Sequence, residues 1–131
     1  MDKNLMNISK IESFFNSMLG KKVSNNVFFT ELPPTIKLEW NSMVVVDCAN
    51  AIQDMNAYGI GIVNVFLYAK PLSSGKKNVA TISKMENALN DCIANSTDGV
   101  YKVRRLNTYT DYDANRKLHC NIVQIEIVII K

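Results

Sequence analysis

The first strong pattern along the chain is helical. Apolar residues recur at spacings of three and four from Ile8 to Leu19 and form one stripe of a helix. Asn7 stands where an N-cap residue is expected, and Gly20 stands where a residue with positive φ commonly ends a helix. The spacing therefore predicts a first helix over residues 8–19.

A second helical pattern lies in the middle of the chain. Between Val79 and Ile93 every third or fourth residue is apolar, and polar side chains occupy the opposite face. The polar stretch 96–99 (STDG) follows and is typical of a helix end.

The first half of the chain also shows the period of two that strands have. A short β-like run covers 27–30 and ends before Pro33. Residues 36–40 then alternate between apolar and polar, which predicts a half-buried strand or an extended arm, because a neighbouring proline disfavours a central strand.

Two β-rich runs, at 43–52 and 59–69, predict a long antiparallel hairpin whose turn lies near 54–58. A loop over 71–78 follows it.

The last third predicts a strand over 100–106, whose imperfect alternation indicates a bulge. A polar loop over 107–115 and a final strand over 118–130 follow. The resulting order, α-β-β-β-α-β-β, predicts an α+β fold with a mainly antiparallel sheet and two helices packed on one face. The length of 131 residues predicts a single domain over 1–131.

Composition places the chain among globular proteins, since 47% of its residues are hydrophobic and 21% are charged. The apolar run 122–130 is too short to cross a bilayer, and charged residues near the N-terminus indicate no secretory signal. The cysteines, Cys48, Cys92 and Cys120, are widely spaced, which favours buried thiols over a disulfide framework or a zinc site.

Candidate catalytic groups are few. Asp111 and Asp113 are the best pair of carboxylates, and with His119 they could serve a small metal-dependent hydrolase. The alternative is a solvated loop whose carboxylates cap or contact a neighbour. His119 and Cys120 are adjacent in a strand and point to opposite faces, so they do not form a nucleophile–base pair.

The net charge of +3 comes from a basic excess in the second half of the chain. Basic residues between 102 and 117, with tyrosines at 101, 109 and 112 as stacking platforms, could bind nucleic acid. Lys102 and Arg104 share a strand face that Arg105 opposes, so only part of this group is coherent. Solvated charges or ion pairs between subunits are the alternative, and the excess is too small for a typical nucleic-acid footprint.

Long apolar strands with exposed edges and few catalytic candidates are typical of an assembly subunit, because exposed edges invite pairing with another chain. The segment 30–40 has two prolines and Trp40, the composition of an arm that packs on another subunit. The alternative is that Trp40 fills this chain's own core.

A family resemblance covers residues 63–131. The stretch contains a strand ending in a polar loop, a helix of the form I-x-x-M-x-x-A-L, a strand, a D-x-D segment and a late strand preceded by a histidine. This order resembles the C-terminal half of the small tail-completion, or tail terminator-like, proteins of tailed bacteriophages and prophages. The helix, extended segment and hairpin before it are also similar. Head–tail connector (neck) proteins have related folds and are the alternative.

The resemblance implies a structural virion protein, assembled in the bacterial host cytoplasm, with no catalytic residues and no cofactor. Subunits similar to these form a homo-oligomeric ring, typically a hexamer, which caps the tail tube and joins it to the head. The implied partners are a tail-tube protein and a head-completion protein, with no membrane and no specific nucleic acid.

The contact surfaces expected for such a ring are the loops 71–78 and 107–117 and the turn 54–58. The candidate interface residues are Trp40, Lys76, Lys77, Arg104, Arg105, Asp111, Asp113 and Arg116.

Overall fold

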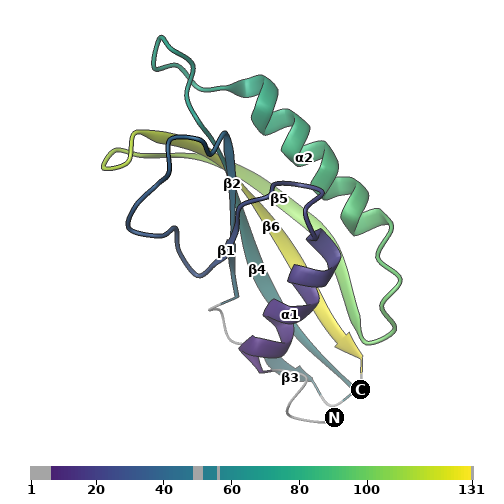
Figure 1. Ribbon diagram of the computed structural model, residues 1–131. Helices are drawn as coiled ribbons and strands as arrows, with labels where there is room; N and C mark the ends of the chain where they lie inside the picture. The colour runs from purple at the N-terminus through teal and green to yellow at the C-terminus, as the bar shows by residue number, and fades with distance from the viewer. Residues whose placement is uncertain (1–6, 49–51, 56, 131) are drawn as a thin grey trace.

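A computed structural model describes residues 7–48, 52–55 and 57–130, and within them it contains two helices and a six-stranded sheet (Figure 1). The elements are, in chain order, α1 (Ile8–Leu19), β1 (Val27–Phe29), β2 (Ser42–Asp47), β3 (Gln53–Met55), β4 (Tyr58–Ala69), α2 (Val79–Ala94), β5 (Tyr101–Asp113) and β6 (Leu118–Ile130). The predicted α+β class, with one helix before the strands and one between them, is confirmed.

The strands lie in the order β1-β2-β4-β6-β5, and β3 pairs with the start of β4. Every pairing is antiparallel except that of β1 with β2. Both helices cover one side of the sheet, here called the helix face, and the long loop between β1 and β2 lies over the other side, the far face (Figure 1). The prediction of two helices on one face is confirmed.

Local chemistry fixes the ends of α1 as the sequence predicts. The Asn7 side chain accepts a hydrogen bond from the Ser9 amide at 2.8 Å, which satisfies one of the free donors of the first turn. Gly20 has a φ of 52°, where a side chain would be strained, and its N–H donates to the Asn16 carbonyl.

The main core lies between the helices and the helix face. Alternate residues of β4 and β6 point into it, and α1 contributes Phe15, which is fully buried. The strand residues of this core include Val63, Val65, Leu67, Val123, Ile125, Ile127 and Ile129. The buried thiols Cys48 and Cys92 lie in the same cluster.

A second cluster fills part of the far face. Residues 36–40 form neither a strand nor a free arm; instead the loop between β1 and β2 folds back over the sheet. The buried members of this cluster are Leu32, Met43, Val45 and Leu118. Phe28, Ile36, Trp40, Phe66 and Tyr68, which are partly buried, pack around them.

The prediction of a polar loop at 107–115 is wrong, because β5 continues through Asp113 and pairs with β6 as far as Leu118. The aspartates and asparagine suggested a loop, but the threonines and tyrosines between them favour a strand. A β-bulge lies between Arg105 and Thr108, close to the irregularity that the alternation indicated.

The predicted 43–52 strand is also too long. β2 ends at Asp47, and β3 is a separate strand of three residues that pairs with β4. Residues 49–51 of the predicted strand lie outside the described residues. Both ends of the predicted turn 54–58 belong to strands, since β3 extends to Met55 and β4 begins at Tyr58, and residue 56 lies outside the described residues.

Replacing Phe15 with alanine is expected to lower the free energy of unfolding by about 3–5 kcal/mol, because it opens a cavity under both helices. Leu38 is 85% exposed, so Leu38→Ala is the matched control and is expected to change the unfolding free energy by less than about 0.5 kcal/mol. Urea denaturation followed by circular dichroism measures both. Equal effects would contradict this description of the core.

Candidate functional site

Two of the basic residues expected at an interface are half-buried and belong to a polar network on the helix face. Arg105 donates to Asn90 Oδ1 at 2.7 Å and lies 3.3 Å from a Glu86 carboxylate oxygen. Glu86 accepts from the Asn121 amide, whose oxygen accepts from Lys77 Nζ at 2.6 Å. The network connects α2 to β5 through Arg105 and to β6 through Asn121, so Lys77 and Arg105 have a structural role.

The Asp113–Arg116 pair builds the turn between β5 and β6. Asp113 Oδ1 accepts from the backbone N–H groups of Asn115 and Arg116, each at 3.0 Å, and Oδ2 accepts from the Arg116 guanidinium at 3.1 Å. These hydrogen bonds, chiefly that from the Arg116 backbone, hold the pKa of Asp113 below its ordinary value of 3.8. Lys117 completes the turn with a φ of 55°.

The three residues of the hydrolase hypothesis are not brought together. Asp111 and Asp113 lie opposite Cys120 and Leu118, whereas His119 lies opposite Tyr112. Directly paired residues project to the same face and neighbours alternate, so His119 projects from the face opposite to the aspartates. Its ring packs against Tyr112, with 4.5 Å between centroids. Within the described residues no group of three His, Cys, Asp or Glu side chains could hold a metal ion.

The tyrosines of the nucleic-acid hypothesis are also divided between faces. Tyr101 is buried against Phe14 at a centroid distance of 5.0 Å. Tyr109 lies opposite Ile122 and Tyr112 lies opposite His119, so these two exposed rings project from opposite faces. They do not form one stacking platform.

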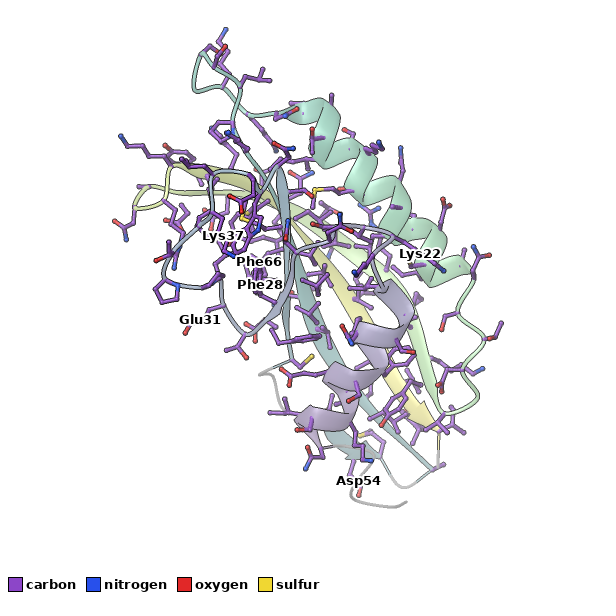
Figure 2. The ribbon with its side chains drawn as sticks, in the orientation of Figure 1. Lys22, Phe28, Glu31, Lys37, Asp54 and Phe66 are labelled. Atoms are coloured by element: carbon purple, nitrogen blue, oxygen red, sulfur yellow. The ribbon has the colours of Figure 1, made fainter. Side chains whose placement is uncertain are left out.

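Trp40 packs on this chain's own sheet. Its ring is 5.3 Å from that of Phe28, and the Lys37 ammonium lies 5.7 Å from its centroid. Figure 2 shows Lys37, Phe28 and Phe66 gathered on the side of the sheet away from α1. The structure therefore supports the core alternative for Trp40, and no part of the described chain presents it as an extended arm.

The thiols are buried as the sequence predicts. Cys48, Cys92 and Cys120 are free and inaccessible. Burial raises the pKa of Cys48 to about 12 and that of Cys120 to about 11, so both remain protonated and unreactive at neutral pH.

The loop between β1 and β2 covers the far face only in part, and beyond it a continuous area remains. We call this area the open face; it consists of Ile60, Ile62, Asn64, Ile122, Gln124, Glu126 and Val128, all half-buried. A hollow of about 560 Å³ lies over it, lined also by Gln53 and Gly61. Apart from Glu126, which lies at its border, the face combines aliphatic and uncharged polar side chains, as the centre of a protein-binding surface does.

The open face continues outward at two of its borders. Where β4 begins and β6 ends, it meets Tyr58 and Ile130, which are 38% and 43% exposed. Towards β5 it meets the ion pair between Arg104 and Glu126, whose closest atoms are 3.3 Å apart. Arg104 is 69% exposed, so this pair forms a polar rim.

The outer edge of β5 is the second candidate surface. β5 is the last strand of the sheet and has 13 residues, and no other described strand pairs with its outer edge. Such an edge presents backbone donors and acceptors to a partner. Sequence reasoning missed it because the second half of β5 was interpreted as a loop.

Lys76 and Asp111 are the other two expected interface residues. Lys76 is exposed in the loop between β4 and α2, as predicted. Asp111 is exposed on β5, and its carboxylate accepts from the neighbouring Tyr112 amide.

A separate groove of about 580 Å³ lies between α1 and the segment that follows α2. It is lined by Lys10, Lys22 and several hydroxyl groups. Asp98 at its edge accepts from the backbone N–H groups of Val100 and Tyr101, each at 2.8 Å, so this carboxylate shapes the start of β5.

No protein-family model matches the chain, and no curated protein matches it. No helix within the described residues is both long enough and apolar enough to span a membrane.

Because the pKa of Asp113 is lowered in the folded state, its charge stabilises the fold above the unfolded pKa, and this contribution is lost as the pH falls through the folded pKa. Asp113→Asn keeps an oxygen acceptor but removes the charge. The wild type is expected to be more stable than this variant at neutral pH, by up to about 1 kcal/mol, with the difference shrinking below the ordinary value of 3.8. Thermal unfolding across this pH range measures it; a constant difference would count against the turn as described.

The placement of Trp40 predicts a fluorescence emission maximum that is blue-shifted relative to the unfolded chain and unchanged with protein concentration. It is the single tryptophan, so the signal is unambiguous. A further blue shift on raising the concentration would show that another chain covers the ring, as the arm hypothesis requires.

Proposed function

We propose that this protein is a non-catalytic assembly subunit that binds other protein chains through the open face and the edge of β5. The observation that carries the proposal is the sheet itself. The helix face carries the main core, while the far face leaves an aliphatic area open beside a long strand edge that no described strand covers. Uncovered edges and apolar surface of this kind are stabilised when another chain pairs with or covers them.

The specific role proposed is that of a tail terminator-like subunit of a tailed bacteriophage or prophage. In this role the chain joins a closed ring, of six copies as in the family it resembles, at the end of the tail tube. The ring ends the tube and offers a surface to a head-completion protein, and the protein is assembled in the host cytoplasm and remains in the virion. Support comes from the sequence resemblance together with the α+β architecture.

The positions of the charged residues favour the faces of the sheet over the loops as contact surfaces. Lys77, Arg105 and Arg116 have partners within the chain. The loop 71–78 retains Lys76 as an exposed cation. The aliphatic part of the open face is therefore expected to supply most of the binding energy, and its charged rim the orientation.

A head–tail connector (neck) role makes use of the same surfaces, and the two roles differ in what their loss does to the virion. Deleting the gene from its phage and examining the lysate by electron microscopy distinguishes them. A terminator-like role predicts tails of irregular, excessive length. A connector role predicts tails of normal length that are not joined to heads, and normal virions would contradict both.

Ile62→Glu places a charge at the centre of the open face and is expected to abolish complementation of the deletion while leaving the protein folded. Ser83→Glu, at an exposed position of α2, is the matched control and is expected to complement fully. Circular dichroism and thermal unfolding verify that both variants fold. Full activity of a folded Ile62→Glu variant would remove the open face from the proposal.

A further inference from the structure

The backbone groups on the outer edge of β5 can be assigned from its pairing with β6. The Ile130 N–H donates to the Val100 carbonyl at 2.8 Å, and the next residues along β5 stay in register up to the bulge. In an antiparallel pair, alternate residues direct both backbone groups to the same side. Lys102 and Arg104 therefore direct their backbone N–H and C=O groups towards β6, whereas Val103 directs its own outward, away from β6.

The same alternation holds for the second half of β5. The register of β6 with β4 is unbroken from His119 to Ile130, so Cys120 directs its backbone groups towards β5, as Ile130 does. Asp111 lies opposite Cys120 and directs its backbone N–H and C=O towards β6. Its neighbours Thr110 and Tyr112 therefore direct theirs outward.

The side chains of β5 carry opposite charges at its two ends. Lys102 and Arg104 occupy the first part of the strand, whereas Asp111 and Asp113 occupy the last part. All four lie opposite even-numbered residues of β6, so they share the far face. An antiparallel partner of the same sequence brings the basic end of one strand against the acidic end of the other.

We propose that the outer edge of β5 pairs antiparallel with the same edge of a second copy of this chain. In the register that fits best, Lys102 lies opposite Asp113 of the second copy, and Arg104 lies opposite its Asp111. Each such pair occurs twice because of the two-fold symmetry. The contact uses an edge with which no described strand pairs, and it does not rest on the proposed virion role.

The direction of the backbone groups is compatible with this register. It places Val103 opposite Tyr112 and Arg105 opposite Thr110, and these residues carry the outward-facing donors and acceptors. The charged pairs then fall at the non-hydrogen-bonded positions, where side chains of opposing strands lie closest.

Neighbouring registers fit less well. A shift by one residue sets outward-facing groups against inward-facing ones and loses the hydrogen bonds. A shift by two residues in either direction keeps only one of the two kinds of charge pair. Near the two-fold axis, the best register places Leu106 opposite Tyr109, which is 51% exposed, so apolar contacts lie between the charged ends.

Such a pair joins the two sheets into one continuous sheet, with both open faces on the same side. A two-fold contact uses the same patch on each copy, so this edge closes at two copies and does not polymerise. Charged residues commonly protect an edge strand from pairing with unrelated strands. In this protein the charges along β5 disfavour pairing with unrelated strands, but they are complementary to the same edge of a second copy.

The test uses two single variants, Arg104→Glu and Asp111→Arg, studied alone and mixed. Alone, each sets like charges against each other twice in the contact and is expected to raise the dimer dissociation constant at least about tenfold. Mixed in equal amounts, every charged pair is again of opposite sign, so the heterodimer is expected to form with an affinity close to that of the wild type. Sedimentation equilibrium over a concentration series measures all of these.

Arg104→Glu also removes the ion pair with Glu126 inside the chain. Glu126→Gln is therefore the control: it breaks that pair without altering the edge, and its dimer affinity is expected to match that of the wild type. Monomeric wild-type protein throughout the series would overturn the proposal. Dimers that neither single variant weakens, or weakened variants that do not recover on mixing, would place the contact elsewhere and also overturn it.

Discussion

The structure depends on one constraint, the burial of a single row of aliphatic side chains on β4 and β6 beneath the two helices. Val65 and Val123 are directly paired and fully buried, and Phe15 of α1 is buried in the same cluster. Neighbouring residues of a strand point to opposite faces, so the burial of this row determines which face each remaining residue of the two strands occupies. The composition of the far face, and therefore the surface available for binding, follows from it.

Periodicity was sufficient to predict the elements that this constraint controls. The residues of α1 and β6 follow one regular pattern from end to end, and both were predicted with the bounds that the structure has. Prediction failed where the cause is tertiary. The turn-forming residues Asp111 and Asp113 suggested a loop, but the pairing partner supplied by β6 keeps them in a strand.

Individual interface residues were harder to predict than elements, because a sequence does not show which charges find partners within the chain. Arg104, Arg105 and Arg116 give the same signal in the sequence and each forms an ion pair within the chain, but the Arg104 side chain is 69% exposed, against 29% and 35% for the other two. Trp40 likewise has the composition signal of an interface residue, and in the single chain it is half-buried against its own sheet. The mixture of Ile122, Gln124, Glu126 and Val128 along β6 indicates a sheet that is only partly covered on one side. The open face as a whole also needs the β4 residues that lie beside them, and the sequence does not show that pairing.

β5 is the part of the molecule where binding to a second copy changes the hydrogen bonds of the backbone itself. Hydrogen–deuterium exchange at the amides of Val103 and Thr110, measured at low and high protein concentration, tests this most directly, because an outward-facing N–H exchanges slowly only when a partner accepts its hydrogen bond. The account predicts fast exchange in dilute solution and marked protection at high concentration, with the inward-facing amides of Arg104 and Asp111 protected in both. Exchange at Val103 and Thr110 that stays fast at every concentration would contradict it.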